Sequence, residues 1–207
     1  MRIAALDLGS NSFHLLIADA TPAGTLTPVL REKEMLRLGD VVARQGRITD
    51  VAADAALETL RRFKALAQVT DCVELVACAT SAIRESANRD AFVARVAAET
   101  GIAVDVISGD TEARLIFSAV RRSVVLEPAP ALCLDLGGGS LEVTIGDVDG
   151  ARWWSSLPLG VARLTAELVG SDPPSRGDLR RLRERLEQAF APVVAAAAVD
   201  PPRMVLG

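Results

Sequence analysis

Asp7-Leu8-Gly9-Ser10-Asn11-Ser12 recurs later in the chain as Asp135-Leu136-Gly137-Gly138-Gly139-Ser140. Both copies read Asp-Leu-Gly, two variable residues and a serine. Each copy ends one short apolar run and precedes another, which is the pattern of a strand, a glycine-rich turn and a second strand. A strand–turn–strand unit that occurs twice predicts two related lobes, each with its loop at the same place.

The rest of the chain alternates between strand-like and helix-like segments. Apolar runs predict strands at 3–8, 13–18, 26–35, 74–79, 104–107, 131–136, 141–145, 152–157 and 204–206. Apolar spacings of three and four predict helices after a cap at Asp50, from a cap at Asn88 to Gly101, and over 110–122, 161–169 and about 179–193. This order indicates an α/β protein.

Pro128 and Pro130 lie in a segment without periodicity, and they predict a boundary between lobes spanning 1–124 and 125–207. Fewer residues follow this boundary than precede it. The last expected strand also leads directly into a turn at Gly207. We therefore expect the second lobe to be incomplete within this chain.

Composition limits the classes of partner. The net charge of −4 argues against a broad basic surface for nucleic acid, although a local basic pocket for a polyanion remains compatible with it. The longest apolar run near the C-terminus, 193–199, is too short to cross a bilayer. The first residues contain too few apolar positions for a signal peptide. The sequence therefore predicts a cytoplasmic protein that binds neither nucleic acid nor membrane.

The two loops have the chemistry of a phosphate site. Glycine-rich turns expose backbone N–H groups and let an oxyanion approach closely. The expected phosphate-binding residues of the loops are Gly9, Ser10, Asn11, Ser12, Gly137, Gly138, Gly139 and Ser140. Asp7 and Asp135 would repel phosphate alone, but they are suitable ligands for Mg²⁺, which binds carboxylates together with phosphate oxygens.

Four stretches resemble the Ppx/GppA phosphatases, within the superfamily of actin, sugar kinases and heat-shock chaperones. They are residues 7–14 (DLGSNSFH), 79–84 (ATSAIR), 107–117 (ISGDTEARLIF) and 157–160 (LPLG). The resemblance runs in order from residue 1 to about 165 and is weak from Gly170 onward. It implies two related ribonuclease H-like lobes of the actin-like ATPase type around a phosphate-binding cleft.

The resemblance also implies roles for single residues. Glu112 corresponds to the base that activates water, although this chain has Thr111 where the family often has a further glutamate. Asp135 and Glu142 correspond to groups near the metal or the attacked phosphate. Together with Asp7, the acid at the head of the first loop, they are the expected metal ligands. Ser81 and Arg84 are expected on phosphate oxygens, and they directly follow a strand, where a short helix could begin.

Simpler interpretations stay open for the two glutamates. Glu112 lies in the first turn of an expected helix, where an acid also complements the helix dipole. Glu142 alternates with apolar neighbours on a strand, as a solvated residue would.

The activity expected from the resemblance is removal of the terminal phosphate of inorganic polyphosphate with Mg²⁺. Three alternatives remain at this point: hydrolysis of guanosine pentaphosphate, a catalytically weak module that binds alarmone or polyphosphate, and a sugar kinase or ATPase. The stretch 107–117 argues against the kinase. The sequence leaves the preferred chain length and the oligomeric state open, a homodimer included.

Overall fold

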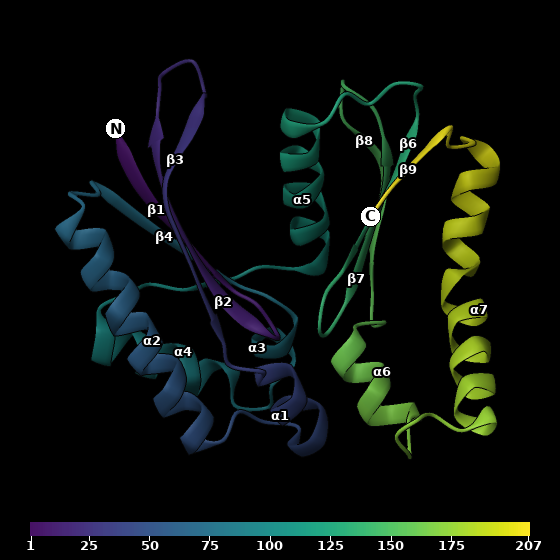
Figure 1. Ribbon diagram of the computed structural model, residues 1–207, viewed down its shortest axis with the longest axis horizontal. Helices are drawn as coiled ribbons and strands as arrows, with labels where there is room; N and C mark the ends of the chain where they lie inside the picture. Colours follow the sequence, from purple (N-terminus) through teal and green to yellow (C-terminus); the bar gives the residue numbers. More distant parts are fainter. The chain divides into compact units, whose positions relative to one another are not determined.

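The computed structural model describes all 207 residues, which form two compact units, Met1–Ile107 and Ser108–Gly207 (Figure 1). The sequence places the boundary after residue 124, whereas by packing it falls before helix α5 (Gly109–Ser123). The reason is that α5 packs on strands of the second unit. Met1–Ile107 is named unit 1 and Ser108–Gly207 is named unit 2.

Unit 1 is a five-stranded sheet in the order β3-β2-β1-β4-β5. Its strands are β1 (Arg2–Leu8), β2 (Ser12–Ala20), β3 (Leu26–Met35), β4 (Glu74–Ala79) and β5 (Asp105–Val106). The first three form an antiparallel meander, and β4 returns parallel to β1. Pro28 is tolerated because β3 is an edge strand, and the register shifts where Pro28 faces Ala18.

The helices of unit 1 are α1 (Leu38–Gln45), α2 (Asp50–Val69), α3 (Ser81–Glu85) and α4 (Arg89–Thr100). One core joins the sheet to α2 and α4, and Phe63 of α2 is fully buried in it. Thr49, rather than the expected Asp50, caps α2, because its hydroxyl accepts a hydrogen bond from the N–H of Ala52 at 3.2 Å. Gly101 ends α4 in a left-handed conformation, as expected.

Asn88 precedes α4 as predicted, but its side chain does not cap that helix. Its amide instead pairs with both backbone groups of Ile48, accepting from the N–H and donating to the carbonyl at 2.9 Å each. Asn88 therefore fastens the loop before α2 to the start of α4.

Unit 2 repeats the first four strands of unit 1. Its strands are β6 (Ala131–Leu136), β7 (Leu141–Gly146), β8 (Ala151–Leu157) and β9 (Met204–Leu206), in the order β8-β7-β6-β9. The antiparallel pairs β6–β7 and β7–β8 and the parallel pair β6–β9 match β1–β2, β2–β3 and β1–β4. The predicted duplication is confirmed at the level of topology.

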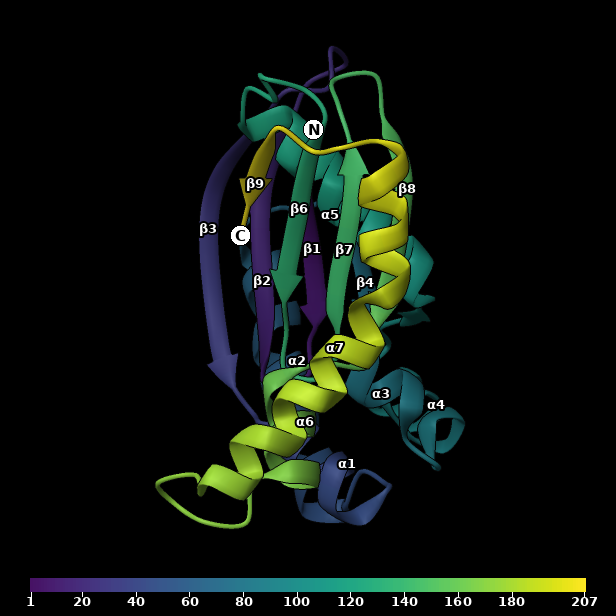
Figure 2. The ribbon, with the colours of Figure 1, turned by 90° about the vertical axis from the view of Figure 1, so that its right-hand side faces the viewer.

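Helices cover both faces of the second sheet (Figures 1 and 2). On one face, Phe117 of α5 packs with Ala131 and Cys133. On the other face, α7 (Arg176–Val199) packs Phe190 and Val193 against strand residues such as Leu141 and Val143. The short helix α6 (Val161–Leu168) follows β8. None of the helices has the length and apolar character needed to cross a membrane.

Candidate functional site

The first loop, residues 9–11, joins β1 to β2 and is held in place by a hydrogen bond from α3. The buried hydroxyl oxygen of Ser10 accepts a hydrogen bond from the N–H of Ala82 at 3.1 Å. The carbonyl of Ser10 accepts from the N–H of Gly39, and the carbonyl of Asn11 accepts from Leu36 and Arg37. The carbonyl oxygens are therefore used internally, while the N–H groups of Gly9, Ser10 and Asn11 have no acceptor within unit 1.

The expected phosphate ligands on α3 lie beside this loop but also bond within the protein. Ser81 is 2 % exposed, and its hydroxyl donates to Glu85 at 2.9 Å. The guanidinium of Arg84 donates to the carbonyl of Ile107 at 3.0 Å. The structure thus brings Ser81 next to the first loop, and the phosphate contacts of Ser81 and Arg84 stay predictions.

The second loop has the same design with a different support. The carbonyls of Gly137 and Gly138 accept hydrogen bonds from the N–H groups of Val161 and Ala162 at the start of α6, at 3.0 and 2.9 Å. The Nε of Arg163 donates to the carbonyl of Gly139 at 2.9 Å. The N–H groups of Gly138, Gly139 and Ser140 have no acceptor within unit 2. The loop therefore keeps three donors for an anion.

Gly160 packs directly against the second loop. A Cβ atom at this position would lie 2.2 Å from the carbonyl carbon of Gly139, a distance at which the backbone must shift. Only glycine therefore allows β8 and α6 to hold the loop in this shape.

Three carboxylates of unit 2 interact electrostatically beside the second loop. Asp135 is the last but one residue of β6 and lies directly opposite Glu142 of β7 in the antiparallel register, so the two side chains share one face of the sheet. Glu112, in the first turn of α5, also acts on Glu142 through its charge. Asp135 is exposed and Glu142 is only 3 % exposed. The solvated strand position considered for Glu142 is therefore wrong.

Glu142 has an unusual protonation behaviour. Burial, together with the negative charges of Glu112 and Asp135, raises the pKa of Glu142 from 4.5 to about 7. Hydrogen bonds from the hydroxyls of Ser156 and Ser140 act in the opposite direction, and the Ser156 oxygen lies 2.7 Å from Oε1 of Glu142. Near neutral pH this carboxyl can hold or release a proton, or ionise beside a cation.

The donor set suits a magnesium ion. No group of three or more His, Cys, Asp or Glu side chains is arranged to hold a metal ion by itself. Mg²⁺, however, usually takes one or two carboxylates and completes its shell with water and phosphate oxygens. Asp135 and Glu142 face each other, and their mutual repulsion would be relieved by a cation. The residues of unit 2 therefore fit Mg²⁺, while metal binding by Asp7 of unit 1 stays a prediction.

Sequence reasoning missed three supporting residues: Ser156, Gly160 and Arg163. Ser156 faces Glu142 across the β7–β8 register, which apolar alternation alone does not specify. Gly160 belongs to the stretch 157–160 that carries the resemblance, but its contact with the loop depends on tertiary packing. Arg163 follows three residues later on α6.

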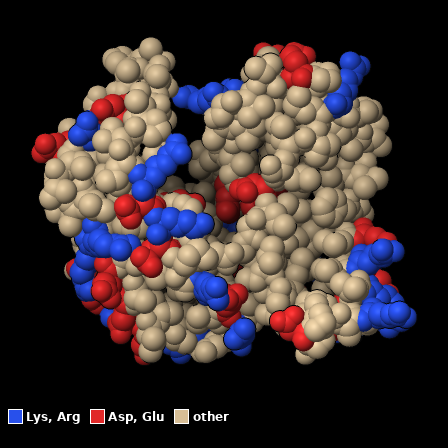
Figure 3. Space-filling view, in the orientation of Figure 1, with Lys and Arg blue, Asp and Glu red and all other residues tan.

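Charges are mixed on the surface. Lys and Arg side chains are interspersed with Asp and Glu on the face seen in Figure 3, in each unit. This arrangement agrees with the composition, which argues against a broad basic surface.

The family model and the most similar relatives agree on one protein family. The model of the "Ppx/GppA phosphatase family" matches residues 16–205. Exopolyphosphatase 1 of Mycobacterium tuberculosis is 41 % identical over 191 residues, which cover 92 % of this chain and 56 % of that protein. Exopolyphosphatase 2 of the same species is 36 % identical, with coverages of 93 % and 64 %. The chain thus spans little more than half the length of the first of these relatives.

Solved structures show the same fold. An exopolyphosphatase from Cytophaga hutchinsonii superposes with a TM-score of 0.93 at 33 % identity, covering 99 % of this chain and 65 % of that one. The Aquifex aeolicus member of the Ppx/GppA family gives a TM-score of 0.75 at 34 % identity, with coverages of 93 % and 62 %. The expected α/β fold of two related lobes is confirmed. The chain belongs to the Ppx/GppA phosphatase family.

Proposed function

We propose that this chain carries the hydrolytic site of an exopolyphosphatase, which releases orthophosphate from the end of an inorganic polyphosphate chain. The observation that carries the proposal is the grouping in unit 2 of Glu112, Asp135 and Glu142 beside a loop with three free N–H donors. Membership of the Ppx/GppA family and likeness to proteins named exopolyphosphatase support the same substrate class.

The loop donors would bind the phosphate under attack. The N–H groups of Gly138, Gly139 and Ser140 provide fixed dipoles for its oxygens, and such donors stabilise charge without reorganising during the reaction. In unit 1, the corresponding donors of Gly9, Ser10 and Asn11 form a second set for phosphate oxygens. Phosphoryl transfer depends chiefly on positioning and electrostatics, so no nucleophilic side chain is required.

Glu112 is the proposed base that orients and activates water. It lies in the first turn of α5, and its charge acts on Glu142 beside the second loop. Asp135 and Glu142 would hold Mg²⁺, which offsets the negative charge of the phosphates when it is bound. Ser156 and Ser140 keep the Glu142 carboxyl in place through their hydroxyls.

Glu142 is the competing candidate for the base. A pKa of about 7 is well matched to proton transfer at neutral pH. Glu142, however, lies directly opposite Asp135, which suits a shared cation, whereas Glu112 is half-buried and more open to a water molecule. We therefore assign the base to Glu112 and the metal to Glu142.

The proposal is tested by phosphate release with Mg²⁺ from long-chain polyphosphate, guanosine pentaphosphate and ATP, measured side by side. Faster release from polyphosphate supports the proposal. Faster release from guanosine pentaphosphate would instead identify this alarmone as the substrate of the same site. Binding of either polyanion without turnover in the presence of Mg²⁺ would reduce the chain to a binding module and overturn the proposed activity.

A further inference from the structure

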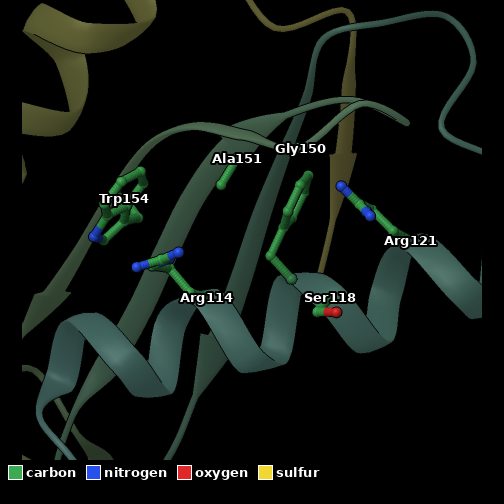
Figure 4. A pocket seen from close by; sticks show the side chains of 7 residues that line it. Arg114, Ser118, Arg121, Gly150, Ala151 and Trp154 are labelled. Carbon is green, nitrogen blue, oxygen red and sulfur yellow. The ribbon is translucent and has the colours of Figure 1, made fainter.

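A separate cavity of about 340 Å³ lies between α5 and β8 in unit 2 (Figure 4). It is lined by Arg114, Phe117, Ser118, Arg121, Gly150, Ala151 and Trp154. Its volume is at the lower end of the range for small-molecule sites. The cavity therefore suits one compact ligand rather than a long chain.

The cavity is on a different flank of α5 from the carboxylates. Arg114, Ser118 and Arg121 follow one another at spacings of four and three, which places them on one face of the helix. Glu112 precedes Arg114 by two residues and so projects about 200° away around the helix. A ligand in the cavity would leave the face of Glu112 uncovered.

The two arginines that line the cavity have no acidic partner. Some arginines of unit 2 pair with acids, as Arg152 does with Asp147 and Arg181 with Asp178. Arg114 and Arg121 form no ion pair, yet both line the same cavity. Guanidinium groups bind phosphate oxygens in a planar fork. Two such groups without acidic partners indicate a site for an anion.

An aromatic side chain on one wall of the cavity adds a second requirement for the ligand. Trp154 contributes its indole, and the guanidinium carbon of Arg114 lies 5.3 Å from the ring centroid. Figure 4 shows Trp154 and Arg114 at one end of the cavity and Arg121 at the other, with Ala151 and Gly150 between them. A ligand that spans this length can place a flat ring near the indole and an anionic group on Arg121.

We propose that this cavity binds a nucleoside monophosphate. The base packs against Trp154 and Arg114, the phosphate binds Arg121, and the hydroxyl of Ser118 is available to the sugar. Arg114 and Phe117 belong to the stretch 107–117, but the carboxylate site uses neither of them. The ligand is a small molecule bound apart from the proposed polyphosphate site, so its binding does not depend on turnover.

The test is a titration followed by the indole N–H signals in ¹H–¹⁵N NMR spectra. The chain has only two tryptophans, Trp153 and Trp154, and Trp153→Phe assigns the two signals. Adenosine monophosphate should shift the Trp154 signal in a saturable way, and adenosine should bind about tenfold or more weakly because it lacks the phosphate. Inorganic tripolyphosphate should shift the Trp154 signal only at higher concentrations than the monophosphate does, because it has no ring.

Variants connect the shift to the cavity. Arg121→Gln and Arg114→Gln should each weaken binding by about ten- to a hundredfold, since each removes charge-assisted contacts. Arg180→Gln, an exposed arginine of α7, is the matched control and should bind as the parent chain does. Glu112→Gln should also leave the titration unchanged, which separates this proposal from the hydrolytic one. Unaltered binding by both cavity variants, a response confined to Trp153, or a Trp154 shift at lower concentrations of tripolyphosphate than of adenosine monophosphate would overturn the proposal.

Discussion

Replacing Glu142 by glutamine removes a buried carboxyl whose pKa is raised to about 7 and keeps the shape of the side chain. The amide oxygen of glutamine can still accept the hydrogen bond from Ser156. The variant therefore removes the proton equilibrium while disturbing the packing little, and its effect on stability should depend on pH.

The direction in which the stability changes with pH follows from the pKa values of Glu142 in the folded and unfolded chain. In the unfolded chain the pKa is near 4.5, and in the folded chain it is about 7. Between these values the folded state holds a proton that the unfolded state releases, so the free energy of unfolding falls as the pH rises. Each pKa unit corresponds to about 1.4 kcal/mol, so the loss is about 3 kcal/mol once the pH exceeds 7. Glutamine escapes this loss because it has no charge at any pH.

The assay is urea unfolding at pH 5, 6, 7 and 8 with EDTA present, followed by tryptophan fluorescence. Both tryptophans lie in unit 2, so the signal reports the unit that contains Glu142. The stability of Glu142→Gln relative to the parent should rise by about 2 to 3 kcal/mol from pH 5 to pH 8. Glu187→Gln, on the exposed side of α7, is the matched control and should show no such trend. A pH-independent difference for Glu142→Gln would refute the reasoning.

Three further outcomes are expected from single substitutions. Glu112→Gln should lower single-turnover phosphate release by about a hundred- to ten-thousand-fold while polyphosphate affinity stays within several-fold, and Asp110→Asn should be much milder; near-normal turnover by Glu112→Gln would move the base to another residue. Gly160→Ala should cost about 1 to 3 kcal/mol in unfolding because its Cβ overlaps the second loop, and phosphate release should fall with it. Thr49→Ala should lower the stability of unit 1 by about 1 kcal/mol, measured by circular dichroism, because the first turn of α2 loses its cap.

Strand positions were predictable from sequence because each strand is a short apolar run bounded by glycine, proline or polar residues. Helix α1 was missed because it has only eight residues and no polar cap, and Arg37 before it adopts a left-handed conformation that the sequence does not suggest. The boundary between units differed for another reason. Pro128 and Pro130 restrict the local backbone, whereas the partner of α5 is set by Phe117 packing on β6.

The loops of the site were predictable because the repeat puts glycine and serine at the same positions twice. The environment of Glu142 was not, because alternation on a strand does not reveal whether its polar face is covered. Its burial and its hydrogen bond with Ser156 depend on the register of three strands and on α5. Such tertiary contacts cannot be predicted from the local sequence pattern. The same holds for Ser10, whose hydroxyl oxygen supports α3.

The two units carry different side chains at equivalent positions of their first three strands. Across the first three strands of each unit, the residues in register are Asp7, His14 and Lys33 in unit 1, and Asp135, Glu142 and Ser156 in unit 2. The serine of each loop bonds to the central residue of its row: Ser12 Oγ lies 2.8 Å from Nε2 of His14, and Ser140 bonds to Glu142. The hydrogen-bond framework of the duplicated site is thus the same, while the central residue differs.

The difference in the central residue makes the second lobe the better place for the proposed cation. Burial, and then the charge of Lys33, lower the pKa of His14, so at neutral pH the imidazole carries no charge. In unit 1 a single acid, Asp7, is therefore accompanied in its row by a lysine and a neutral imidazole. In unit 2 the row holds two acids, and Glu112 adds a third charge that acts on Glu142. A divalent cation lowers the electrostatic energy of the second row far more than that of the first. The proposed Mg²⁺ position beside Asp135 and Glu142 is therefore favoured over one beside Asp7.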